Sequence, residues 1–202
     1  MHSSAVEHAA LVRRVRLVSW LSLGWMAAEA TIALAAGLAA SSIALIGYGL
    51  DSGVEAAAGA VVIWRFTGER IRSDAAERRA QKVDAASFFL LAPYIVVAAV
   101  QRLATANTAR ASWVGIGLAL ASIVLMPLFG RAKQGLGSRL CSRATVGEGI
   151  QNVLCAYLSL ALLIGLAANA LLGLQWADPV AALVVAVVAA RAGMRTWRGE
   201  AC

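Results

Sequence analysis

The fold of this chain is decided by residues 42–64, SIALIGYGLDSGVEAAAGAVVIW, which are long and apolar enough to cross a bilayer as one helix. The stretch nevertheless carries two acids near its middle, Asp51 and Glu55, where an unpaired charge costs roughly 3 kcal/mol. Because these acids are four residues apart, both project from one helix face, and Tyr48 and Ser52 extend the polar stripe. Two stacked acids repel each other unless a cation or a proton lies between them. The stretch therefore predicts a buried cation site.

The composition indicates an all-α integral membrane protein. Apolar residues make up 60% of the 202 residues and charged residues only 14%, whereas soluble domains have about 25% charged residues. The net charge of +7 does not indicate nucleic-acid binding, because the basic residues fall between hydrophobic runs. The three cysteines have no CxxC spacing, so they predict neither a disulfide framework nor a zinc knuckle.

Hydrophobic runs predict six transmembrane helices in a single domain. They cover about residues 15–39, 42–64, 85–103, 113–129, 147–172 and 177–195. Residues 1–14 are expected to form a polar lead-in, 67–84 a charged, solvated segment that is helical at the membrane surface, and 131–143 a basic connection. Every Lys and Arg except Arg102 and Arg110 falls on one side of this arrangement, so both termini are expected to be cytoplasmic.

The fifth predicted span carries a second polar stripe. Its members are Glu148, Gln151, Asn152 and Cys155, at positions i, i+3, i+4 and i+7. Two polar stripes in so apolar a bundle should face each other. The alternative is that the amides and the thiol only form hydrogen bonds between helices, worth about 0.6–2 kcal/mol each. That alternative suits a stripe of neutral groups better than a pair of like charges.

Facing stripes would surround one point with a metal site made of Asp51, Glu55, Gln151 and Cys155. Carboxylate oxygen and thiolate sulfur suit a tetrahedral ion such as zinc, whereas magnesium or calcium sites avoid sulfur. In a medium of low dielectric constant the two acids should share one proton when no metal is bound, and a divalent ion would displace it. Metal and proton then compete for one site, which is the minimum requirement for coupled exchange.

Other polar groups at membrane depth are candidates for an ion pathway. Glu29 in the first predicted span either bonds to a neighbouring helix or takes part directly in transport, and the sequence leaves both open. Tyr48 and Ser52 accompany the paired acids, and Glu148 and Asn152 lie one to two turns before Cys155. An enzyme is not expected, because the chain has no HExxH motif, no pairing of a nucleophile with a base and no histidine inside a span.

The chain resembles the cation diffusion facilitator (cation efflux) family, and in particular its short bacterial members that consist of the membrane domain alone. The resemblance is carried by GLDSGVE at 49–55, TVGEGIQNVLCAYLS at 145–159 and WADPVAALVV at 176–185, and extends from the first span to Arg198. In the family a His or Asp and an Asp occupy the fifth-span positions at which this chain has Gln151 and Cys155.

The resemblance implies an efflux transporter for zinc or a similar divalent metal, working as a metal/proton antiporter by alternating access. It also implies a homodimer in the bacterial inner membrane, with lipid, protons and the divalent cation as partners and no prosthetic group. The usual cytoplasmic C-terminal domain is not expected after residue 195, so dimer contacts would lie in the membrane. Glu148 would guide ions at the cytoplasmic mouth. The alternative is a non-transporting structural or interaction protein that retains the fold.

Overall fold

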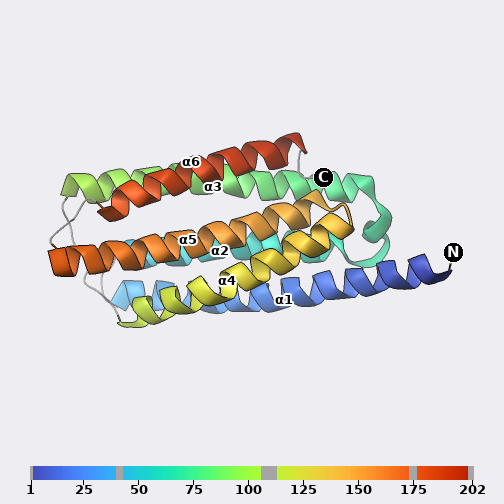
Figure 1. Ribbon diagram of the computed structural model, residues 1–202, viewed down its shortest axis with the longest axis horizontal. Coiled ribbons are helices and arrows are strands. Elements are labelled where there is room, and N and C mark those ends of the chain that lie inside the picture. The colour runs from blue at the N-terminus through green and yellow to red at the C-terminus, as the bar shows by residue number, and fades with distance from the viewer. Residues whose placement is uncertain (1, 40–42, 106–112, 173–176, 200–202) are drawn as a thin grey trace.

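The computed structural model describes residues 2–39, 43–105, 113–172 and 177–199, and this part of the chain is all-helical (Figure 1). Its α-helices follow the expected order of six. They are α1 (His2–Ala39), α2 (Ile43–Arg65), α3 (Asp74–Thr105), α4 (Trp113–Arg139), α5 (Arg143–Leu172) and α6 (Ala177–Arg198), with a short 3-10 helix, η1 (Gly68–Arg72), between α2 and α3.

Four of the helices extend beyond the predicted spans by four residues or more. Helix α1 begins at His2 rather than near residue 15, and α3 begins at Asp74 rather than at 85. Helix α4 continues to Arg139, and α5 begins at Arg143, so the expected basic connection is mostly helical. Hydropathy marks the part of a helix that suits hydrocarbon, whereas the helical hydrogen-bond ladder continues into the polar region. The polar lead-in and the basic connection, for which the sequence analysis gives no secondary structure, are therefore mostly helical in the described residues.

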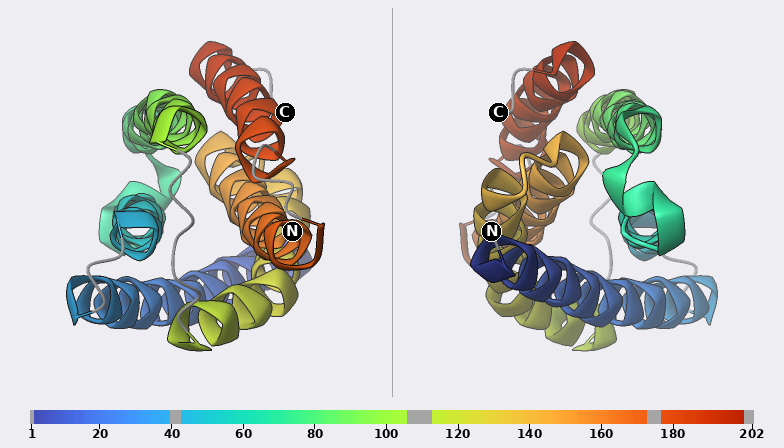
Figure 2. Two further views of the ribbon diagram at one scale, coloured as in Figure 1. Left: turned by 90° about the vertical axis from the view of Figure 1, so that its left-hand side faces the viewer. Right: turned by 90° about the vertical axis from the view of Figure 1, so that its right-hand side faces the viewer.

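The helices form a bundle in which α2 and α5 lie between two outer pairs (Figures 1 and 2). Helices α1 and α4 cross on one side, and α3 and α6 run side by side on the other. Helix α4 packs most extensively against α5, and α1 against α2. The start of α1, the end of α6, the α2–α3 connection and the α4–α5 turn lie at the same end of the bundle, here called the terminus end.

A pair of glycines brings α4 and α5 close together. A Cβ atom added to Gly130 would lie 2.7 Å from the carbonyl oxygen of Gly149, and one added to Gly149 would lie 2.8 Å from that of Gly130. Small residues at such positions allow the backbones of membrane helices to touch. The close approach places the polar stripe of α5 directly against α4.

The outer surface of the bundle is apolar. Three helical segments in the described ranges are long and apolar enough to cross a membrane, namely Glu7–Ala39, Asp74–Gln101 and Trp113–Arg139. Large apolar side chains such as Leu90 and Val124 point outward with more than half of their surface exposed. A surface of this kind suits contact with lipid rather than with water.

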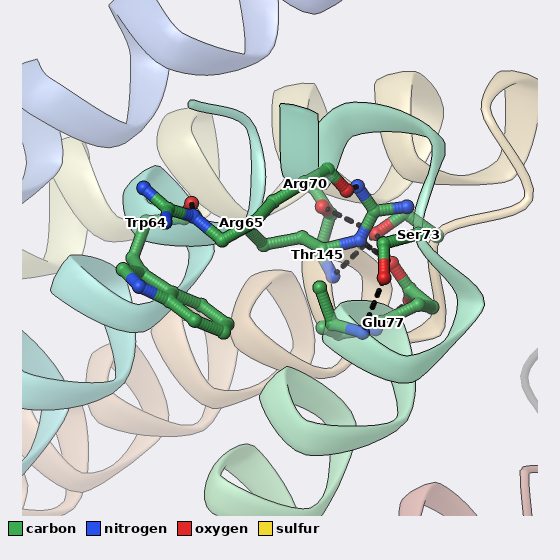
Figure 3. A network of polar contacts seen from close by, with 9 residues as sticks. Trp64, Arg65, Arg70, Ser73, Glu77 and Thr145 are labelled. Atoms are coloured by element: carbon green, nitrogen blue, oxygen red, sulfur yellow. Dashed lines mark hydrogen bonds and ion pairs between the residues drawn. The ribbon is translucent and has the colours of Figure 1, made fainter. Parts of the chain in front are cut away.

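A polar network joins three helices at the terminus end (Figure 3). The Nε of Arg65 donates a hydrogen bond to the Glu77 carboxylate at 2.8 Å, and the Nη1 of Arg65 donates to the Arg70 carbonyl at 2.7 Å. Ser142 and the backbone N–H of Ala144 also donate to Glu77, both at 3.1 Å. Glu77 therefore binds the end of α2 and the first turn of α5, so it is not part of the purely solvated face that the sequence predicted.

Candidate metal centre

Three potential metal ligands meet where α2 packs against α5. They are Asp51, Glu55 and Cys155, whose ligand atoms all lie within 4.8 Å of one another. The i, i+4 spacing on a continuous α2 puts both carboxylates on one face, as the sequence predicted. All three side chains are buried, with Asp51 the most accessible at 5%. The arrangement brings two oxygen ligands and one sulfur ligand to one point.

The acids of this cluster lack the hydrogen bonds that a buried carboxylate normally has. Oδ1 of Asp51 and both oxygens of Glu55 have no hydrogen-bond donor among the described residues, although the Cys155 thiol lies beside them. Met26, Met126 and Ala156 pack around Cys155 and exclude water. Buried polar atoms are almost always satisfied, so these oxygens fit a positively charged guest. A divalent ion would satisfy them together.

Gln151 faces a different helix from the rest of the cluster. Its side-chain oxygen accepts a hydrogen bond from the hydroxyl of Ser87 on α3 at 3.0 Å. Its amide nitrogen has no partner among the described residues. Gln151 is fully buried one turn before Cys155, and its predicted role as the fourth metal ligand stays a prediction.

Glu29 of α1 is the centre of a hydroxyl network. Its carboxylate accepts hydrogen bonds from Tyr48 at 2.6 Å, from Ser52 at 3.0 Å and from Ser122 of α4. The Tyr48 hydroxyl also lies 3.2 Å from that of Ser159 on α5. The structure contains the hydrogen bonds to neighbouring helices, and a direct part of Glu29 in transport stays a prediction. Tyr48 and Ser52, predicted as pathway residues, are thus donors to Glu29.

Glu148 and Asn152 of α5 bind a lysine. The ammonium of Lys133 on α4 forms an ion pair with Glu148 and donates to the Asn152 side-chain oxygen at 3.0 Å. The Lys133 side chain has no solvent exposure and that of Glu148 only 1%. The Asn152 amide in turn donates to the sulfur of Met126 at 3.2 Å. Glu148 and Asn152, which the sequence predicts as ion-pathway residues, therefore both bind the buried ammonium group of Lys133.

Sequence comparison supplies the family. Residues 74–199, which comprise α3 to α6, match the cation efflux transmembrane domain. The chain belongs to the cation efflux family. No curated protein matches the chain. Family membership makes it a multi-pass membrane protein that belongs to a family of cation transporters rather than of enzymes.

The match does not include the first two helices of this cation efflux protein, which carry Glu29, Asp51 and Glu55. The resemblance of residues 1–73 to the family therefore stays a prediction that rests on the spacing in α2. Cys155 lies inside the matched region, so the three-ligand cluster joins a matched helix to an unmatched one. Its geometry comes from the structure alone.

Two buried charges of the cation efflux protein were missed by the sequence reasoning. Lys133 was assigned to a basic connection, although it follows the buried positions Met126 and Gly130 at spacings of seven and three on one face of α4. Asp84 was assigned to a solvated segment, although it lies four residues after Ala80 and four before Phe88, both of which are fully buried. Both charges continue a helical face of small or apolar residues, and that periodicity is the sequence signal that points to them; the helix that buries each is known only from the structure.

Proposed function

We propose that this cation efflux protein exports a divalent metal cation, with zinc preferred, in exchange for protons. The observation that carries the proposal is the buried cluster of Asp51, Glu55 and Cys155 with its unsatisfied oxygens. Two carboxylates and one thiolate match the ligand types of zinc sites. The fourth position falls to Gln151, to water or to another group.

Exchange for protons follows from the two acids. Side by side in an apolar surrounding, Asp51 and Glu55 hold a shared proton when the metal is absent, because a pair of buried like charges is costly. A divalent ion replaces that proton, and the thiol of Cys155 loses its own proton on binding. Alternating exposure of the cluster to the two sides of the membrane then couples metal exit to proton entry.

The proposal includes six membrane crossings with the terminus end in the cytoplasm. Helices α2, α4 and α6 finish at this end and carry arginines in their last turns, as cytoplasmic helix ends do. We assign the protein to the bacterial inner membrane, and a homodimer with contacts inside the membrane is proposed from the family resemblance. Chemical crosslinking in membranes tests the dimer.

The test is metal uptake into proteoliposomes under a pH gradient, comparing zinc, cobalt, manganese and iron(II). Wild type should transport zinc, and Asp51→Asn and Glu55→Gln should lower the flux to background because each removes a charged ligand. The exposed carboxylate of Glu69 provides a matched control, since Glu69→Gln removes the same charge away from the cluster. This control should transport as wild type does.

The outcomes separate the alternatives. Flux of another metal without zinc flux would correct the substrate and retain the transporter. Absence of flux for every metal would favour a structural or interaction protein that keeps the fold, an alternative to which the replacement of the family's His and Asp by Gln151 and Cys155 points.

A further inference from the structure

A second group of buried polar and charged side chains lies beside the polar stripe of α5, toward the terminus end. It consists of Lys133, Glu148 and Asn152, with Asp84 of α3 beside them. Lys133 binds one oxygen of Glu148 and the side-chain oxygen of Asn152. Carboxylate and amide oxygens are also ligands for metal cations. The ammonium shows that this place accepts a positive charge in a region closed to water.

The group has more negative than positive charges. Neither carboxylate oxygen of Asp84 has a hydrogen-bond partner among the described residues, and Oε2 of Glu148 also lacks one. Asp84 is only 1% exposed and lies in electrostatic range of both Glu148 and Lys133. With two acids and one lysine, Asp84 has no ion-pair partner among the described residues, and its ionisation in this buried place is costly unless a further cation binds beside it. The group can therefore take one more cation than the chain provides.

Its surroundings connect it with the candidate metal centre. A Cβ atom added to Gly59 of α2 would lie 2.8 Å from Oε1 of Glu148, so Glu148 fills the space that this glycine leaves. Gly59 is one turn after Glu55 on the same face of α2. Along α5, Glu148 precedes Cys155 by seven residues, a rise of about 10 Å toward the terminus end. Asn152, which accepts a hydrogen bond from Lys133, lies between Glu148 and Cys155 along α5.

We propose that Glu148, Asn152 and Asp84 form a second cation site, which the Lys133 ammonium occupies in this conformation and yields to the transported divalent ion. Glu148 and Asn152 supply ligand atoms, and Asp84 supplies a second negative charge when the divalent ion binds. Lys133 acts as a tethered cation that blocks the site until it withdraws. This inference depends on the proposed function for its cargo, and a metal-binding stoichiometry tests the two separately.

The experiment measures zinc bound per chain by equilibrium dialysis of the purified full-length protein in detergent. Wild type should bind one zinc ion, at the cluster of α2 and α5. Lys133→Gln should bind two, because the tethered cation is gone. Adding Asp84→Asn to that variant should restore one, and Lys133→Arg, which keeps the charge, should stay at one.

A single zinc ion on folded Lys133→Gln would overturn the second site. If wild type binds none, the proposed function fails, while a zinc ion gained with Lys133→Gln and lost with Asp84→Asn would still support the inference. If Lys133→Gln does not fold, the test is the zinc flux and the zinc affinity of the single variant Asp84→Asn. Zinc flux at least tenfold lower with unchanged zinc affinity supports the site, and unchanged flux overturns it.

Discussion

Replacing Asp51 by asparagine is expected to stabilise the metal-free protein and to abolish its stabilisation by zinc. The ligand atoms of Asp51 and Glu55 lie within 4.8 Å of each other in the buried cluster. At this separation two unit charges repel by about 3.5 kcal/mol for an effective dielectric constant near 20. The neutral amide removes that repulsion. A proton shared by the two acids already relieves part of this repulsion in wild type, so the gain should be smaller than the full repulsion between two ionised acids.

Zinc binding should stabilise wild type relative to Asp51→Asn. Zinc at a concentration of 100 Kd stabilises a protein that binds it by about 2.7 kcal/mol. For a chain of this size, that free energy corresponds to an increase of about 5–11 °C in the unfolding temperature. Asp51→Asn removes one of the two charged oxygen ligands, so its unfolding temperature should not respond to zinc at the same concentration. The difference in unfolding free energy between the two proteins should therefore change by about 2.7 kcal/mol in favour of wild type when zinc is added.

The assay is thermal unfolding in detergent of wild type, Asp51→Asn and the exposed control Glu69→Gln, each with and without zinc. The control should show the same zinc-dependent increase as wild type, which excludes a general effect of lost negative charge. An equal increase in Asp51→Asn and wild type would refute the reasoning. The cluster would then not be where the metal binds.

Three further predictions concern the groups around the cluster. Glu29→Gln and Tyr48→Phe should show a coupling energy of about 0.5–2 kcal/mol in a double-mutant cycle of unfolding, because they share a hydrogen bond; additivity would contradict this. Gly130→Val should lower the unfolding temperature by collision with Gly149, whereas Gly24→Ala, which has open space around it, should not. In zinc titrations the apparent Kd should rise about tenfold per unit decrease in pH for each displaced proton; a pH-independent Kd would exclude proton exchange at the cluster.

The paired acids of α2 could be found from the sequence because their signal is local. When an apolar run is helical, two charges four residues apart in it lie on the same helix face, one turn from each other. Cys155 could be added because it ends a polar stripe of the same kind. The structure brings these three together as predicted. The number and order of the helices followed from hydropathy in the same way.

The charges outside the apolar runs could not be assigned in this way. Lys133 and Asp84 lie in segments whose average polarity resembles that of a surface loop, yet both are buried. Their burial depends on which helix packs against them, and that is a tertiary property. Asp84, for example, lies against Gly147 of α5, where a Cβ atom would collide with its carboxylate. The mean hydropathy of a sequence window contains no information about such a contact between helices.

Helix geometry explains why Gln151 and Asn152 of the α5 stripe contact different helices. A helix turns by about 100° per residue, so Gln151 and Asn152 diverge by that angle although both belong to the stripe. Gln151 faces Ser87 of α3, and Asn152 faces Lys133 of α4. Cys155 is almost in line with Glu148, because seven residues complete nearly two turns. The direct line along α5 therefore joins the metal cluster to the lysine-bound acid, and the proposed second cation site rests on this alignment.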